Sequence, residues 1–266
     1  MTYRRLPFDQ YFIDTSEDFQ KTGRVRAKIE YIGVEYTCDP EKHPIEHLLG
    51  IRHEVNYAFW YDEERDVIQI HFQKTNSKSD WFANIFEFAS KYYDAFPFEG
   101  ELVTLRVHRG WGDMYKAIKH IIRDQWQALH LAHPQAETEI IGWSLGSGQA
   151  MLCCQDLNYN FGIRPYLYTY GSVRPFKARP TERALLERYL NSICRKCCNF
   201  ANRNDIVTYL PPFPGFRMIL RREIGREAIS LGKLLNPKLY HTSYHMKELY
   251  RRPKHRGENQ AQDTGL

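Results

Sequence analysis

No stretch of the 266 residues is long and apolar enough to span a bilayer as a helix. The N-terminal residues MTYRRLPFDQ lack the apolar core of a secretory signal, so we expect a cytoplasmic protein. Internal repeats and a recognisable domain linker are also absent. A chain of this length with 42% hydrophobic residues therefore fits one α/β domain over residues 1–252, followed by a polar tail at 253–266 that we expect to be disordered.

Cysteine is scarce and poorly spaced for metal binding. The chain has six cysteines, and residues 194–198 contain a single C-x-x-C pair. A zinc site needs about four ligands, and no second C-x-x-C or H-x-x-H spacing accompanies this pair. Because no export signal is visible, the pattern favours reduced thiols beside the core over zinc or disulfides. We expect neither a metal nor an organic cofactor.

The excess of positive charge is small. The formal net charge is +5, with basic clusters at Arg221, Arg222 and Arg226 and across residues 251–256. Such clusters either attract anionic surfaces such as phospholipid headgroups or form a solvated face with a charged tail. The modest charge favours the solvated face, and no nucleic-acid partner is expected.

The order of the expected elements indicates the fold class. Alternating residues predict antiparallel strands at 24–37, 53–61 and 66–72, with a hairpin turn at 62–65. Further strands are predicted at 101–107, 138–141, 165–170, 198–201, 216–220 and 227–231, the last two as a pair. Helices are predicted at 80–93, 113–132, 147–154, 180–190 and 243–252. Antiparallel strands followed by alternating strands and helices predict an α/β fold with a mostly parallel central sheet flanked by helices.

The most informative motif is G-W-S-L-G at residues 142–146, between the strand at 138–141 and a helix. Glycine two residues either side of Ser144 permits a sharp strand–turn–helix that lifts the hydroxyl clear of the sheet. The helix N-terminus behind it favours negative charge that develops beside the serine. Small residues at 146 and 148 would also let helix and strand approach closely. The alternative is a glycine-rich turn with an incidental serine.

A serine nucleophile needs a base, an acid that orients the base, and donors for the oxyanion. In sheets that carry such a turn, the acid and then the histidine follow the serine along the chain. Asp205 follows a short strand and would lie at the carboxyl edge of the sheet, although a turn aspartate can also simply accept from nearby backbone N–H groups. His241 and His245 precede the last expected helix, and either could be the base.

Several blocks in order, across residues 66–250, together resemble the fungal-type (class 3) lipases, which implies an α/β-hydrolase-like fold. The WSLG segment is similar to the family's G-H-S-L-G-G elbow, with Trp143 in place of histidine and Ser147 in place of glycine. The VHRGW block at 107–111 resembles V-H-x-G-F, and YGSVRPF at 170–176 resembles F-G-S-P-R-V-G.

Two further blocks imply site residues. Residues 202–212 resemble N-x-x-D-x-V-P-x-L-P-P, which implies that Asp205 is the triad acid, with Thr208 in place of the usual proline. Residues 74–84 resemble G-T-x-S-x-x-D-W-x-x-N, which implies that Thr75 is one oxyanion donor; the N–H of Leu145 would be the other. Lys74 replaces the family's glycine, and its side chain could alter this loop or hang over the acyl pocket.

The resemblance leaves the base open between two histidines. The H-T-S-Y segment at His241 resembles the H-x-x-Y ending of secreted fungal members, and the H-M-K-E-L-Y segment at His245 resembles the H-x-x-E-x-Y ending of plant and bacterial members. We prefer His245 because an amphipathic face of Met246, Leu249 and Tyr250 follows it, with His241 as the alternate base.

Residues 79–96 are rich in aromatic side chains. The resemblance implies that this region forms or borders a lid over the active site, and a core-packed helix is the alternative. A lid would exclude water and favour an apolar acyl chain.

Together these residues predict a serine hydrolase that cleaves carboxylic esters, a lipase acting on acylglycerols or related lipid esters at a lipid interface. A phospholipase A1 or short-chain esterase is one alternative, suggested by the basic clusters. A catalytically inactive hydrolase fold that binds lipid or protein is another, suggested by Lys74 and the altered elbow.

Overall fold

The computed structural model describes residues 32–36, 48, 53–72, 90–201, 205–212, 214–219 and 222–223. The expected strand before Ile32, the strand at 227–231, the helix at 243–252 and the tail at 253–266 lie outside these residues. Among the described residues, no helix has the length and apolar character needed to cross a membrane.

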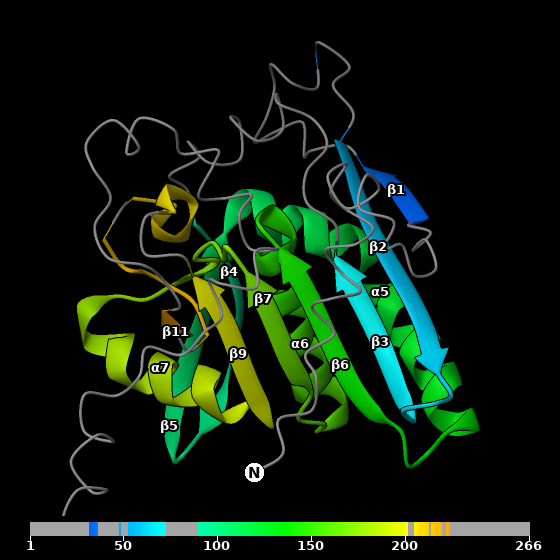
Figure 1. Ribbon diagram of the computed structural model, residues 1–266. Coiled ribbons are helices and arrows are strands. Elements are labelled where there is room, and N and C mark those ends of the chain that lie inside the picture. The colour runs from blue at the N-terminus through cyan, green and yellow to red at the C-terminus, as the bar shows by residue number, and fades with distance from the viewer. Residues whose placement is uncertain are drawn as a thin grey trace, which may run out of the picture.

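A seven-stranded sheet forms the centre of the molecule (Figure 1). Its first three strands are antiparallel, and from the third strand on neighbouring strands run parallel. The mostly parallel sheet with antiparallel N-terminal strands is therefore confirmed. In spatial order the strands are β1 (Ile32–Tyr36), β2 (His53–Asp62), β3 (Val67–Phe72), β6 (Glu137–Trp143), β7 (Tyr166–Tyr170), β9 (Lys196–Ala201) and β11 (Arg222–Glu223).

A second, four-stranded antiparallel sheet was not predicted. Its order is β10 (Phe216–Arg217), β8 (Phe176–Lys177), β5 (Glu101–His108) and β4 (Ser90–Phe98). The two shortest strands of this sheet have two residues each. Strands this short form only because residues far away in the sequence pair with them, so the local sequence does not predict them. β10 pairs with β8, and the expected pairing of the strand at 216–220 with 227–231 stays a prediction because residues 227–231 lie outside the described residues.

The helix predicted at 80–93 is wrong over its described end. Residues from Ser90 onward belong to β4, and Ser90 pairs with His108 of β5. Phe96 is buried and packs on Tyr159 and Tyr189, at ring separations of 5.2 and 4.6 Å. Residues 90–96 therefore belong to a sheet, and Phe96, at the end of the proposed lid region, is part of the core. Residues 79–89 lie outside the described part of the chain.

Three helices complete the described fold: α5 (Arg109–Ala132), α6 (Leu145–Phe161) and α7 (Arg183–Ser192), the last preceded by a 3-10 turn, η1 (Pro180–Glu182). Figure 1 shows α5 and α6 side by side behind the central sheet. α5 begins at Arg109 rather than at 113. Gly110 and Gly112 are poor helix formers, but the first turn holds the fully buried Trp111, and this packing offsets their low propensity.

The core lies between the central sheet and these helices. Alternate residues of β3 point to this side, and Ile68, Ile70 and Phe72 are fully buried there. Trp126 of α5 donates from Nε1 to Thr138 Oγ1 over 2.9 Å, which ties the helix to β6 beside the core.

A buried ionic network joins α5 to α6. Arg123 of α5 donates two hydrogen bonds to the carboxylate of Asp156, which is 3% exposed, and these bonds raise the pKa of the guanidinium. Tyr115 Oη and Asn160 Nδ2 donate to the same carboxylate over 3.1 Å each. Such a group is stable when buried only while its charge is paired.

We expect Arg123→Met to lower the free energy of unfolding by about 3 kcal/mol, because it leaves a buried carboxylate without its counter-ion. The matched control is Arg188→Met, which removes an exposed arginine paired with Glu99 and Glu101 and should change little. Urea unfolding followed by circular dichroism measures both. Equal effects of the two substitutions would show that the network contributes nothing beyond a surface pair.

Candidate active site

The turn between β6 and α6 has the strand–turn–helix geometry predicted for residues 142–146. Ser144 follows the last residue of β6 directly and precedes the first residue of α6, with φ 57° and ψ −123°. A non-glycine residue rarely adopts a positive φ, and such backbone strain is typical of functional sites. A Cβ on Gly142 would lie 2.4 Å from the carbonyl oxygen of Gly146, so only glycine fits there.

Backbone hydrogen bonds hold Ser144 in this conformation. Its N–H donates to the carbonyl of Tyr170 over 2.8 Å, and its own carbonyl accepts from the N–H of Ser147 over 3.0 Å. Leu145 begins α6, so its N–H belongs to the positive end of the helix dipole. The turn therefore presents a serine beside backbone N–H groups, which is the arrangement that an oxyanion needs.

Ser147 is the replacement that the sequence pattern marked as a departure, and it has a defined role. Its hydroxyl is fully buried, donates to the carbonyl of Ser144 and accepts from the N–H of Val173 over 3.2 Å. The side chain thus bridges the elbow and the segment after β7. Gly148 lies in the same contact, with its Cβ position 3.1 Å from Val173 Cγ2 and 3.4 Å from Trp111 Cγ.

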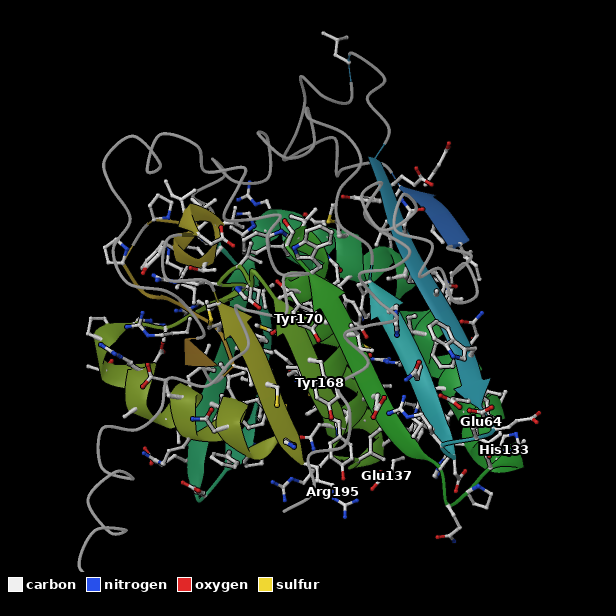
Figure 2. All side chains as sticks on the ribbon, in the orientation of Figure 1. Glu64, His133, Glu137, Tyr168, Tyr170 and Arg195 are labelled. Atoms are coloured by element: carbon white, nitrogen blue, oxygen red, sulfur yellow. The ribbon has the colours of Figure 1, made fainter. Side chains whose placement is uncertain are left out.

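The strand register brings Asp205 to the same edge of the sheet as Ser144. Trp143 at the end of β6 pairs with Tyr170 at the end of β7, which pairs with Phe200 near the end of β9. Ser144 follows the first of these strands, and Asp205 follows the third. Figure 2 shows Tyr170 toward the carboxyl edge of the sheet and Arg195 at the opposite edge. Asp205 therefore lies at the carboxyl edge of the sheet, as predicted.

The Asp205 carboxylate is fully buried and oriented by its own turn. Its Oδ1 accepts from the N–H of Val207 over 2.9 Å at the start of a 3-10 turn, η2 (Ile206–Tyr209). Thr208, which stands where the family pattern has proline, donates from Oγ1 to the carbonyl of Asp205 over 2.8 Å. The aspartate therefore does accept from a local backbone N–H, as a simple turn residue would, and the same bond fixes the direction of its carboxylate.

The segment from 171 to 174 connects the serine turn to the aspartate turn. Ser172 Oγ donates to Asn199 of β9 over 2.8 Å. Arg174 donates from its backbone N–H to the carbonyl of Leu210 over 2.9 Å and from Nε to the carbonyl of Thr208 over 3.2 Å. Since Val173 also binds Ser147, this one segment fixes the position of Ser144 relative to Asp205. The sequence signal for it was the YGSVRPF block, which suggested no role.

The burial of His71, on β3 of the central sheet, disfavours it as a base. Burial, with a smaller contribution from the positive charge of Arg65, lowers its pKa to about 3. It is therefore neutral near pH 7 and far from the pKa that a general base needs. Several predicted positions lie outside the described residues. They are the oxyanion donor Thr75, its neighbour Lys74, and the two candidate bases His241 and His245.

Within the described residues, no group of three or more His, Cys, Asp or Glu side chains is placed to hold a metal ion. The thiols of Cys154 on α6 and Cys194 after α7 approach to 3.2 Å in the core. Five described cysteines are free thiols.

Comparison with known proteins identifies the family. Residues 69–214, more than half of the chain, match the model of the family described as lipase (class 3). The chain therefore belongs to the class 3 lipase family, as its motif order predicted. No curated protein sequence matches the chain.

Solved lipase structures share the fold. A fungal lipase–inhibitor complex is 26% identical with a TM-score of 0.52, and the match covers 61% of this chain and 58% of that one. A triacylglycerol lipase described as having a serine protease triad is also 26% identical, with a TM-score of 0.53 and coverage of 64% and 61%. A Penicillium cyclopium protein, at 16% identity and a TM-score of 0.55, matches over 84% of this chain and 80% of its own. The first two matches span less than two thirds of those lipases.

The close contacts at the elbow predict that alanine destabilises the protein far more at position 142 than at position 148. Gly142→Ala places a methyl group against backbone atoms that cannot move independently, and we expect it to lower the free energy of unfolding by roughly 3 kcal/mol or more. Gly148→Ala meets only side-chain atoms, and its gain of about 1 kcal/mol in helix propensity offsets part of the crowding. Chemical denaturation of both variants tests this. Equal losses would contradict the close backbone contact at 142.

Proposed function

We propose that the protein is a serine hydrolase that cleaves carboxylic esters, a lipase acting on acylglycerols or related lipid esters. The observation that carries the proposal is the strained conformation of Ser144 at the N-terminus of α6, on the sheet edge that also carries the buried Asp205. Membership of the class 3 lipase family supports it, as does the triacylglycerol lipase with a serine triad among its structural relatives.

In the proposed reaction, Ser144 Oγ attacks the ester carbonyl while His245 accepts the hydroxyl proton. Asp205 orients the imidazole and stabilises its positive charge. The N–H of Leu145 and the side chain of Thr75 hold the negative oxygen of the tetrahedral intermediate. His245 then returns the proton to the leaving alcohol. In the second half of the reaction, His245 takes a proton from water, the water oxygen attacks the acyl carbonyl, and His245 gives that proton to Ser144 Oγ as the carboxylic acid is released. The chemistry requires no metal or organic cofactor.

A lipid surface as the site of action is supported by two exposed apolar residues beside the proposed acid. Ile206 is 55% exposed and Tyr209 is 39% exposed, and both lie on η2 directly after Asp205. Arg174 lies over the Tyr209 ring at 5.3 Å from its centroid, which places a cation at the edge of the same patch. One of the related structures is described in terms of interfacial activation.

A fluorophosphonate probe tests the nucleophile directly. We expect the wild-type protein to be labelled and Ser144→Ala to lose labelling, with hydrolysis of a nitrophenyl ester lowered by on the order of 10³-fold or more. The matched control is Ser192→Ala, at the end of α7, which should label like the wild type. An unlabelled wild-type protein would support the inactive binding fold instead, and equal labelling of Ser144→Ala would place the nucleophile elsewhere.

A comparison of two histidine variants tests the base. We expect His245→Ala to lower kcat for the nitrophenyl ester by roughly 10³-fold, because the hydroxyl proton loses its acceptor. His241→Ala should stay near the wild-type rate. Asp205→Asn should lower kcat by on the order of 10²- to 10⁴-fold with KM little changed, since it leaves the imidazole without its orienting charge. If His241→Ala is the inactive variant, the base is His241.

A further inference from the structure

A cavity of about 650 Å³ lies outside the proposed active site. It is formed where β5, β8 and β10 of the second sheet meet η1 and the start of α7. Neither Ser144, Leu145 nor Asp205 lines it. Its volume falls in the range of about 300–1,000 Å³ that is typical of small-molecule sites.

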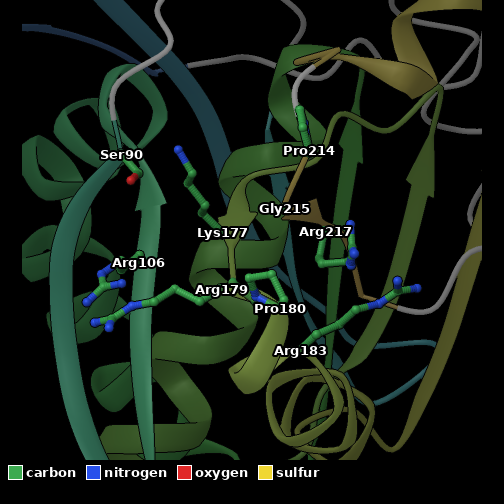
Figure 3. A pocket seen from close by; sticks show the side chains of 10 residues that line it. Ser90, Arg106, Lys177, Arg179, Pro180, Arg183, Pro214, Gly215 and Arg217 are labelled. Atoms are coloured by element: carbon green, nitrogen blue, oxygen red, sulfur yellow. The ribbon is translucent and has the colours of Figure 1, made fainter.

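The lining of this cavity is strongly basic. Of the described residues that line it, half are cationic and none is acidic (Figure 3). The remaining lining residues are Ser90 and small or ring residues that leave room between the charges. The five cations are Arg106, Lys177, Arg179, Arg183 and Arg217.

Two carboxylates hold four of these cations in place. Glu182 lies 3.9 Å from Arg106 Nη1 and 3.4 Å from Arg179 Nε. Figure 3 shows the side chains of those two arginines extending to the same side of the cavity. One carboxylate shared by two guanidinium groups positions both but neutralises only half of their charge.

The second carboxylate is arranged in the same way. Glu187 Oε1 lies 3.0 Å from Arg183 Nε and 3.0 Å from Arg217 Nε. Arg183 is the first residue of α7, so the positive end of that helix adds to the potential. The cavity therefore has a net positive charge after its internal pairs are counted.

The fifth cation, Lys177, forms no ion pair with an acid in the described part of the chain. Lys177 Nζ lies 5.0 Å from the centroid of the Phe216 ring, and within the described ranges no carboxylate is within ion-pair distance of it. A lysine in this position gains only a weak cation–π contact. Its ammonium is available to a ligand that enters the cavity.

Backbone geometry brings these cations together. Ala178 donates from its N–H to the carbonyl of Gly215 over 2.9 Å, next to the β8–β10 pairing. Gly215 has φ +92°, and a Cβ there would lie 2.8 Å from the carbonyl of Ala178. In the same sheet, Lys177 of β8 lies directly opposite Arg106 of β5 on one side and Phe216 of β10 on the other, which puts two of the five cations side by side.

Like charges gathered in this way repel one another, and exposed ion pairs return little stability. Arginine guanidinium groups match phosphate oxygens in two-point contacts, and lysine adds a point charge. We propose that this cavity binds a phosphate-rich group with more than one phosphate, from a lipid headgroup or a free metabolite. The proposal does not depend on the ester hydrolase activity.

The test uses two probes on the Ser144→Ala protein, so that no hydrolysis interferes. One is soluble inositol hexakisphosphate, measured by calorimetry at an ionic strength of about 0.15 M. The other is phosphatidylcholine vesicles with a minor fraction of phosphatidylinositol bisphosphate, measured by sedimentation. Vesicles with the same charge supplied by phosphatidylserine are the reference. Binding of the soluble probe alone indicates a free ligand, and preferential binding of bisphosphate vesicles indicates a headgroup.

The pocket variant combines Lys177→Gln with Arg183→Gln and should bind at least about tenfold more weakly. The control variant combines Lys116→Gln with Arg195→Gln, which removes equal charge from surface positions that do not line the cavity. It should bind within about twofold of the parent, since long-range attraction is largely screened at this salt. If the double pocket variant does not fold, Arg183→Gln alone, at a residue 58% exposed, replaces it.

Three results would overturn the proposal. These are no binding of either probe, equal binding to phosphatidylserine and bisphosphate vesicles without soluble binding, and equal losses in the pocket and control variants. Labelling of the wild-type protein by a fluorophosphonate is unaffected by any of them, so the two proposals fail separately.

Discussion

The close contact between Gly142 and the backbone of Gly146 and Ser147 is the constraint on which the rest of the candidate site depends. It lets the chain reverse from a buried central strand into a helix within one residue, and that residue is Ser144. The strain of its positive φ is held by bonds on both sides, from Ser144 N–H to Tyr170 and from Ser147 to the Ser144 carbonyl. A larger side chain at 142 would open the turn and move the serine away from the helix N-terminus.

The same bonds extend from the elbow to the proposed acid. Ser147 binds Val173, and Arg174, the next residue, binds two carbonyls of the aspartate turn. Two of the positions that depart from the family pattern, Ser147 and Thr208, supply hydrogen bonds within this chain of contacts. These departures are thus compatible with an ordered site. They give no physical reason to regard the fold as an inactive copy.

Much of the central sheet could be predicted from periodicity, because β3, β6 and β7 are apolar runs with partners that follow in simple order. The second sheet could not. The aromatic residues at the start of β4 fit a helical face as well as a strand face, and pairing with β5 decided between them. β8 and β10 are too short to have a pattern of their own, and the basic cavity that they help to form was invisible for the same reason.

The sequence by itself determined the family, and it predicted the position of the proposed nucleophile and the order of the proposed catalytic residues, because tight turns and parallel strands restrict which residue types can occupy them. It also indicated Asp205 through a motif, without showing that the carboxylate is buried and held by Val207. Only the tertiary structure decided that the segment from 171 to 174 links the two turns, and that five cations from β5, β8, β10 and the η1–α7 segment meet in one cavity. Both depend on contacts between residues far apart along the chain, and no local pattern encodes such contacts.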